Sequence, residues 1–203
     1  MTTDYQLLTK KPWYQRPSVN AAPEGFDTLF ADTVTVLHRA ATSTPCVFAC
    51  SLSAEDMVLF HLIHREQVAI HTFALDTERL PKATLKLWES AESRYGAIIE
   101  RVAPDGERLR ALALAQSNSS IFESRAARER CCTVRKTEPL RRALAGKAAW
   151  VTGLRRAQST GRASVPHQEW DTGFGLEKFN PLADWSDEAI WYFIDREDIP
   201  VSV

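Results

Sequence analysis

The chain has 203 residues, which is enough for one α/β domain with a sizeable core. Its formal net charge of -1 at pH 7 excludes the broad positive potential of proteins that bind nucleic acid or membranes non-specifically, so we expect neither partner. No run of about 18 apolar residues occurs, and the first residues lack the apolar core of a secretion signal. These observations predict a cytoplasmic protein with reduced thiols.

Short apolar runs alternate along the chain with segments of helical hydrophobic spacing. We expect a loose leader over residues 1–25 and one domain over residues 26–203. The predicted helices cover residues 26–41, 57–65, 81–95, 106–117, 121–130, 138–145 and 186–196. The predicted strands cover residues 46–50, 68–75, 97–102 and 148–152, and residues 155–175 are predicted to form a polar loop. This alternation predicts an α/β fold, a parallel twisted sheet with helices on both faces.

Polar loops follow three of these strands, at the edge where parallel sheets bind ligands. The first loop carries Ser51, Ser53, Glu55 and Asp56 directly before a helix. Hydroxyls and backbone N–H groups at a helix N-terminus can bind an anion, or the serines can act only as helix caps. The loop lacks the glycines of a Walker motif, which argues against a P-loop nucleoside triphosphatase.

The second loop begins at the end of its strand with Leu75, Asp76 and Thr77, and it includes Arg79. A carboxylate at this edge can bind a ribose hydroxyl or a metal, or it can cap the next helix. Arg79 can face a phosphate or the solvent.

The third loop contains Gly153, Arg155, Arg156 and Arg162. Neighbouring arginines after a strand suit a ligand with several negative charges. The alternative is a basic loop that only contacts solvent.

Two of the four cysteines, Cys131 and Cys132, are adjacent and lie among cations. Neighbouring cysteines rarely bond to each other, and nearby cations favour the thiolate, which is the form that binds zinc and iron–sulfur clusters. The alternative is a helix in which both are small core residues. Cys46 and Cys50 lie in an apolar strand, where we expect them to pack.

Five blocks of the sequence, in their order, resemble the assimilatory adenylyl-sulfate reductases, within the wider group that includes phosphoadenylyl-sulfate reductases. The blocks are Ser51-Leu-Ser-Ala-Glu-Asp-Met-Val-Leu59, Leu75-Asp-Thr-Glu-Arg-Leu-Pro81, Cys131-Cys132 with Arg135-Lys136 and Pro139-Leu140, Trp150-Val-Thr-Gly-Leu-Arg-Arg156 with Gln158-Ser159 and Arg162, and Lys178-Phe-Asn-Pro-Leu-Ala-Asp-Trp185. The resemblance implies an adenine-nucleotide α-hydrolase-like fold. It runs from about residue 26 to the end of the chain.

The reaction implied by this resemblance is the reduction of adenylyl sulfate to sulfite and AMP in sulfate assimilation, on the way to cysteine. A cysteine thiolate attacks the sulfate sulfur, AMP leaves, and thioredoxin or a glutaredoxin-like donor releases sulfite from the S-sulfocysteine. Lys136 takes a catalytic role, since a fixed cation stabilises charge on the departing phosphate. The implied substrate-binding residues are Ser51, Ser53, Glu55, Asp56, Leu75, Asp76, Thr77, Arg79, Lys136, Gly153, Arg155, Arg156 and Arg162.

The resemblance also implies a cofactor, because the Cys-Cys pair of cluster-bearing members supplies two ligands of a 4Fe-4S cluster. In those members a later Cys-x-x-Cys supplies the other two ligands, and a Glu-Cys-Gly-Leu-His-like tail carries the nucleophile. No cysteine follows Cys132 here. We therefore expect a truncated form that is inactive alone and holds half of the cluster site.

Other departures and alternatives follow from the same comparison. Leu52 and Ser53 stand where many relatives carry a glycine, which could change how closely the backbone approaches a phosphate. The alternatives are a phosphoadenylyl-sulfate reductase, an adenylyltransferase-like domain of the same fold and a non-catalytic nucleotide-binding remnant. A homo-oligomer is a further possibility.

Overall fold

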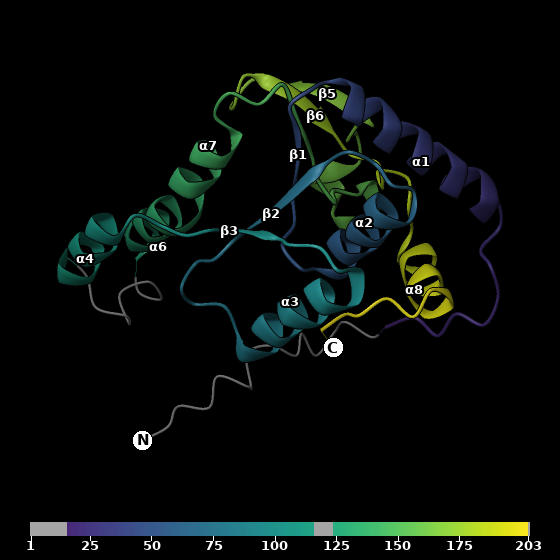
Figure 1. Cartoon of the computed structure of the whole chain (residues 1–203), viewed down its shortest axis with the longest axis horizontal. Coiled ribbons are helices and arrows are strands. Elements are labelled where there is room, and N and C mark those ends of the chain that lie inside the picture. Colours follow the sequence, from purple (N-terminus) through teal and green to yellow (C-terminus); the bar gives the residue numbers. More distant parts are fainter. Residues whose placement is uncertain (1–15, 116–123, 203) are drawn as a thin grey trace.

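A computed structural model describes residues 16–115 and 124–202 (Figure 1). Its described strands form one six-stranded sheet in the order β3-β2-β1-β4-β6-β5. Neighbouring strands are parallel, except that β5 runs antiparallel to β6. The strands are β1 (Cys46–Ala49), β2 (His71–Leu75), β3 (Glu100–Val102), β4 (Ala149–Val151), β5 (Gln168–Asp171) and β6 (Leu176–Phe179).

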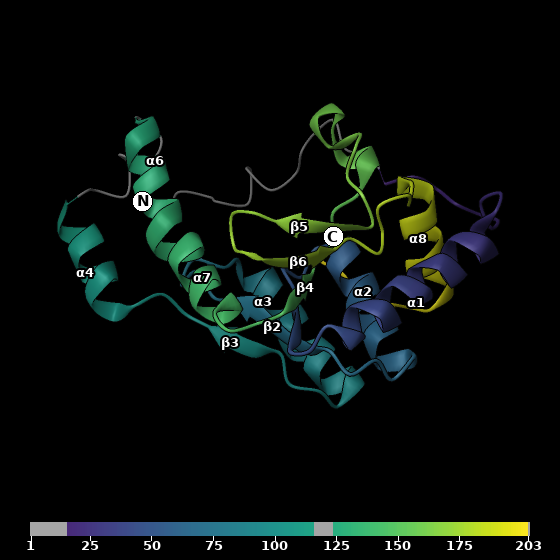
Figure 2. The ribbon, with the colours of Figure 1, turned by 90° about the horizontal axis from the view of Figure 1, so that it is seen from above.

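The helices cover both faces of this sheet, as the sequence predicted (Figures 1 and 2). The larger core is built with side chains of α1, α2, α3 and α8, and the smaller core lies under α7. The α-helices are α1 (Phe26–Thr42), α2 (Ala54–Arg65), α3 (Lys82–Tyr95), α4 (Gly106–Ala115), α6 (Arg125–Cys132), α7 (Glu138–Leu144) and α8 (Asp187–Arg196). A π-helix, η2 (Thr133–Thr137), joins α6 to α7, and two short 3₁₀ helices, η3 (Arg156–Gln158) and η4 (Thr160–Arg162), follow β4.

Strand β1 explains why the centre of the sheet was predictable. Val47 packs into the smaller core and Phe48 into the larger one, because successive side chains of a strand point to opposite faces. Both are buried, with exposed fractions of 2% and 0%. A strand that is covered on both faces reads as a continuous apolar run, so this segment was recognisable without alternation.

The segment predicted as a polar loop over residues 155–175 is corrected by the structure. It contains two 3₁₀ turns and the strand β5, whose sequence is Gln-Glu-Trp-Asp, and the next strand, β6, was also missed. Strand β5 is the edge of the sheet, and Trp170 at its centre is 62% exposed. An exposed edge strand carries no buried apolar face that the sequence could reveal. Strand β5 is the one antiparallel member of the described sheet, which is otherwise parallel as predicted.

The start of one helix also shifts. Helix α2 begins at Ala54 rather than residue 57, because Ser53 is its N-cap. The predicted break at residues 118–120 lies outside the described residues. Among the described residues, no helix is long and apolar enough to cross a membrane.

Candidate functional site

Two adjoining cavities lie at the carboxyl ends of β1, β2 and β4. The first has a volume of about 410 Å³ and the second about 330 Å³. Ala49, Ser51 and Trp150 line both of them. Residues of all three predicted loops reach these cavities, because β2, β1 and β4 are neighbours that run in the same direction.

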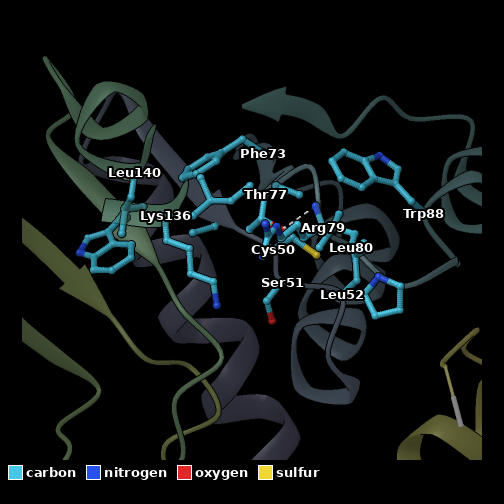
Figure 3. Close-up of a pocket in the computed structure, with 15 residues that line it drawn as sticks. Cys50, Ser51, Leu52, Phe73, Thr77, Arg79, Leu80, Trp88, Lys136 and Leu140 are labelled. Carbon is cyan, nitrogen blue, oxygen red and sulfur yellow. Dashed lines mark hydrogen bonds between the residues drawn. The ribbon is translucent and has the colours of Figure 1, made fainter. Parts of the chain in front are cut away.

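The first cavity is mostly apolar, and two cations reach it (Figure 3). Arg79 comes from the loop after β2, and Lys136 comes from the π-helix η2. The apolar lining includes Phe73, Leu75, Leu80, Trp88, Leu140 and Trp150. An apolar pocket with a few convergent polar groups is typical of a site for a small organic ligand.

The second cavity is more polar and lies beside the N-terminus of α2. Hydroxyls and two cations belong to its lining, which includes Ser51, Ser53, Asp56, Thr152, Gly153, Gln158, Arg162 and Lys178. The N-terminus of a helix favours negative charge. The lining of this cavity therefore suits an anionic group.

The buried carboxylate of Asp56 stabilises the loop before α2 through hydrogen bonds. Its Oδ2 accepts hydrogen bonds from the backbone N–H of Ser51 at 2.7 Å and from the Ser51 hydroxyl at 2.5 Å. Burial raises the pKa of Asp56 to about 6, although the bonds from Ser51 act in the opposite direction. Leu52, between them, has a φ of 62°. This left-handed conformation is one that glycine adopts at low cost and that a leucine rarely adopts.

Gly153 closes the other side of the same loop. A Cβ atom at this position would lie 2.2 Å from Asp56 Oδ1 and 3.2 Å from Glu55 Cβ. The backbone after β4 can therefore approach the first turn of α2 only because residue 153 has no side chain.

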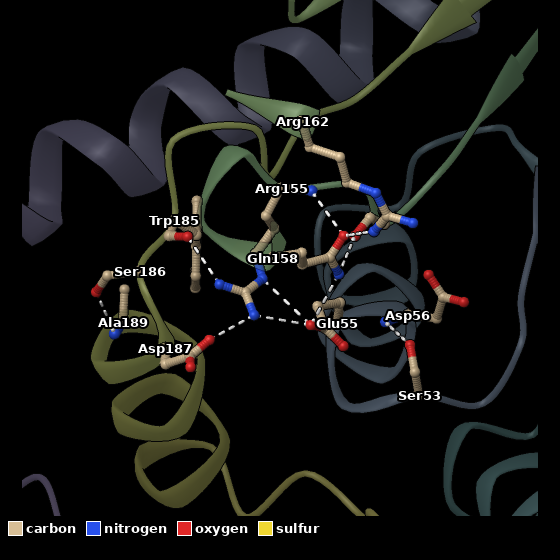
Figure 4. A network of polar contacts seen from close by, with 11 residues as sticks. Ser53, Glu55, Asp56, Arg155, Gln158, Arg162, Trp185, Ser186, Asp187 and Ala189 are labelled. Atoms are coloured by element: carbon tan, nitrogen blue, oxygen red, sulfur yellow. Dashed lines mark hydrogen bonds and ion pairs between the residues drawn. The ribbon is translucent and has the colours of Figure 1, made fainter. Parts of the chain in front are cut away.

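Arg155 lies at the centre of a buried polar network rather than in the lining of either cavity (Figure 4). Its Nη2 contacts Glu55 Oε1 at 2.8 Å and Asp187 Oδ1 at 2.6 Å, and its Nη1 donates to the Trp185 carbonyl at 3.0 Å. Gln158 also donates to Glu55 at 3.0 Å. Burial raises the pKa of Glu55, but the hydrogen bonds from Arg155 and Gln158 outweigh it and hold this pKa below its ordinary value.

Arg156 and Asp76 are also engaged within the protein. Arg156 donates through Nε to the Val165 carbonyl at 2.7 Å and pairs with Asp184. Asp76 pairs with Arg101 at 2.8 Å. Like Arg155 and Glu55, these residues do not line the two cavities.

The other predicted binding residues do come together at the cavities. Ser51 lines both, the first is lined by Leu75, Thr77, Arg79 and Lys136, and the second by Ser53, Asp56, Gly153 and Arg162. Sequence reasoning missed Lys178 of β6, whose side chain lines the second cavity. Its only signal was its place in the last of the five blocks, since β6 itself was not recognised.

Known proteins share the sequence pattern and the fold of this chain. The sequence profile of the family described as "Phosphoadenosine phosphosulfate reductase domain" matches residues 45–202. The chain belongs to this family. The resemblance drawn from the five blocks and the predicted fold class are confirmed. A crystal structure of phosphoadenylyl-sulfate (PAPS) reductase from Candida auris, in a phosphate complex, has the same fold, with a TM-score of 0.72, 21% identity and coverage of 92% of both chains.

Curated relatives in this family are named adenosine 5'-phosphosulfate reductase. The protein of Allochromatium vinosum is 52% identical over 154 residues, which are 76% of this chain and 60% of the relative. The protein of Neisseria meningitidis serogroup A is 40% identical over 195 residues, which are 95% of this chain and 78% of the relative. The chain therefore spans about three fifths of the first relative and more of the second.

The adjacent cysteines of this reductase-family chain lie at the C-terminal end of α6. Both are free thiols, Cys131 half-buried and Cys132 exposed. The described residues contain no group of three or more His, Cys, Asp or Glu side chains that could hold a metal ion. Cys46 and Cys50 are buried as predicted, and burial raises the pKa of Cys46 to about 12 and that of Cys50 well above its ordinary value. They stay protonated and pack in the core.

The π-helix η2 connects this cysteine pair to the first cavity. Arg135 in η2 donates through Nη1 to the Thr77 carbonyl at 2.6 Å, and the next residue, Lys136, lines the cavity. Single turns of π-helix are frequent at functional sites, because they redirect side chains within a helix. No pattern in the sequence predicted this turn.

The contact between Gly153 and Asp56 can be tested by adding one methyl group. Gly153→Ala should lower the free energy of unfolding by about 1–3 kcal/mol, because the new Cβ overlaps Asp56. Urea unfolding followed by circular dichroism measures it. Gly161→Ala is the matched control, since a Cβ there meets no atom within 4 Å. Equal stability of the two variants would contradict the close packing of these loops.

The raised pKa of Asp56 predicts a pH dependence of stability. A carboxyl whose pKa is higher in the folded state stabilises the fold below its unfolded pKa, and this contribution is lost as the pH rises through about 6. Between pH 4 and 7 the free energy of unfolding of the wild type should therefore fall by on the order of 2–3 kcal/mol relative to that of Asp56→Asn. Urea unfolding at a series of pH values tests this. Asp32→Asn, on the exposed side of α1, should follow the wild type, and parallel curves for all three proteins would contradict the prediction.

Proposed function

We propose that this chain is the nucleotide-binding part of an adenosine 5'-phosphosulfate reductase, which reduces adenylyl sulfate to sulfite and AMP. The observation that carries the proposal is the pair of adjoining cavities, one apolar with Lys136 at its wall and one polar beside a helix N-terminus. The names of the curated relatives support adenylyl sulfate as the substrate. Because the chain spans 60% of the first relative, the activity of the intact protein is part of this proposal.

In this proposal the nucleotide extends across the two cavities. The base lies among the apolar side chains of the first cavity, near Leu75 and Trp88. The anionic groups reach the cations and the α2 N-terminus near Ser51, where both cavities meet. Fixed cations and N–H groups stabilise phosphate and sulfate without reorganisation. The substrate-binding roles that the resemblance implies for Arg155 and Arg156 stay predictions, since both are engaged with carboxylates of this chain.

The proposed chemistry is thiol-dependent. A cysteine thiolate outside the 203 residues of this sequence attacks the sulfate sulfur, and the sulfur–oxygen bond to AMP breaks. AMP leaves with the electron pair of that bond, and Lys136 stabilises the charge that develops on its phosphate. A dithiol donor, thioredoxin or a glutaredoxin-like protein, then attacks the enzyme sulfur and releases sulfite. The two donor thiols end as a disulfide and supply the two electrons.

A 4Fe-4S cluster is the cofactor of this proposal, and Cys131 and Cys132 would supply two of its four thiolate ligands. Their free thiols and exposure at the end of α6 fit such a role, but the described residues hold no complete ligand set. When bound, the cluster would add a redox-capable group near Lys136. We also propose that the reductase domain begins at about residue 26 and that the other two cluster ligands lie outside this sequence. Self-association into a homo-oligomer is part of the same proposal.

The role of Lys136 can be tested by binding. Lys136→Ala should weaken the affinity for adenylyl sulfate about tenfold to hundredfold, because a charge-assisted hydrogen bond is lost. Isothermal titration measures the dissociation constant. Lys147→Ala removes the same charge outside the two cavities and should bind like the wild type. Equal affinities of the two variants for adenylyl sulfate would contradict the placement of Lys136 in the binding site. Binding of adenylyl sulfate without turnover, in any longer form of the protein, would favour the non-catalytic nucleotide-binding remnant.

The cysteine pair can be tested by iron content. We expect Cys132→Ser to abolish cluster retention in protein made with its natural downstream sequence, because a hydroxyl is a poor ligand for iron. Iron and acid-labile sulfide are measured after anaerobic purification, with roughly four irons per chain in the wild type. Cys46→Ala changes a buried cysteine of β1 and should retain the iron. Brown colour and full iron content in Cys132→Ser would exclude the ligand role.

A further inference from the structure

Lys178 is a partly buried cation at the second cavity that none of the roles above includes. It lies on β6 and its side chain is 16% exposed. Its Nζ is 3.0 Å from Glu169 Oε1 on β5, where the two residues are register partners across the strand pair. The same Nζ lies 5.8 Å from the centroid of the Trp150 ring.

This position fixes where the ammonium group can act. Trp150 forms the wall that the two cavities share, so Lys178 lies close to their junction. An ammonium has three N–H donors, and Glu169 accepts from one direction only. Pairing with a single carboxylate holds the flexible side chain in place, and further donors remain for a ligand in the cavity.

The rest of the cavity lining is also suited to an anion. Ser51 and Ser53 stand at the N-terminus of α2, and Arg162 of η4 adds a second cation. The one carboxylate of the lining, Asp56, is directed to Ser51 through Oδ2. Two cations and a helix N-terminus therefore converge on one cavity of about 330 Å³.

We propose that Lys178 binds the 5′-phosphate of the nucleotide, with Glu169 as the residue that positions its side chain. The inference rests on the proposed function, because it requires a nucleotide with its base in the first cavity. A phosphate on a nucleoside in that cavity would lie towards the junction at Ser51 and Trp150, where Lys178 is placed. The two N–H groups that do not face Glu169 then donate to phosphate oxygens.

The test compares two ligands that differ only in this phosphate. Dissociation constants of AMP and adenosine are measured by isothermal titration with the 203-residue chain. In the wild type AMP should bind more tightly than adenosine. Lys178→Met should weaken AMP binding about tenfold or more and leave adenosine within about twofold, since only the charged contact is lost. Lys178→Arg keeps the charge and should retain most of the preference for AMP.

Two further variants separate a local charge effect from a structural one. Lys86→Met, on the exposed face of α3, makes the same substitution outside both cavities and should change neither affinity. Glu169→Gln keeps an oxygen that can accept a hydrogen bond from Lys178 and so can still position it, but it removes the competing negative charge, so it should tighten AMP binding while adenosine stays unchanged. Loss of the AMP preference in Glu169→Gln would show that the ion pair acts only structurally and would overturn the assignment.

The remaining outcomes are also decisive. If Lys178→Met keeps the AMP preference, or loses affinity for both ligands equally, Lys178 does not bind the phosphate. If the wild type binds neither AMP nor adenosine, the proposed function itself fails, and the inference fails with it. A failure of the Lys178→Met prediction leaves the nucleotide-binding site supported, whereas absence of binding by the wild type does not. The failure of the inference and the failure of the proposed function are therefore distinguishable.

Discussion

The close approach of Gly153 to Asp56 is the constraint on which the site depends. Strands β1 and β4 are parallel neighbours, so the segments that follow them leave the sheet side by side. They can pack against each other only because Gly153 lacks a side chain, which would otherwise lie 2.2 Å from the Asp56 carboxylate. Asp56 in turn holds Ser51. The absence of a side chain at Gly153 therefore allows the packing that positions Ser51, which lines both cavities.

Two adjacent residues at the start of α2, Glu55 and Asp56, stabilise different parts of this arrangement of loops. Asp56 faces inward to Ser51, whereas Glu55 faces Arg155. Arg155 then reaches Asp187 at the first turn of α8 and the Trp185 carbonyl. Acidic residues at the N-terminus of a helix are stabilised by the helix dipole, so α2 and α8 both offer favourable places for carboxylates that face this arginine. The network joins the two helices to the loop after β4.

The sequence could predict the parts of the fold that are driven by burial. Central strands such as β1 are covered on both faces and therefore appear as apolar runs. Strand β5 was not predictable in this way. It lies at the edge of the sheet, where Trp170 is exposed and its neighbours are polar, so it has no buried apolar run. The π-helix η2 was not predicted either, since hydrophobic spacing identifies helices over windows longer than its five residues. Its effect on Lys136 appears only in three dimensions.

The candidate site was predictable at the level of loops and less so at the level of single side chains. An arginine in a basic loop can face a ligand or a buried carboxylate, and the sequence does not contain the partner that decides between them. Arg155 has two carboxylates within 3 Å, which offset the cost of burying its charge. Without them, Arg155 could not be 4% exposed.

Lys178 shows the reverse case, in which topology turns an unremarked residue into a candidate for the site. The strand that carries it pairs with β4 on one side and β5 on the other. The β4 neighbour places Lys178 near Trp150 and the cavity, and the β5 neighbour supplies Glu169 as its counter-charge. A cation with one flanking carboxylate is held in place, yet it keeps donors for an incoming anion. A cation enclosed by two carboxylates, as Arg155 is, serves the fold instead. The second carboxylate around Arg155 therefore distinguishes it from Lys178, which keeps N–H donors for a ligand.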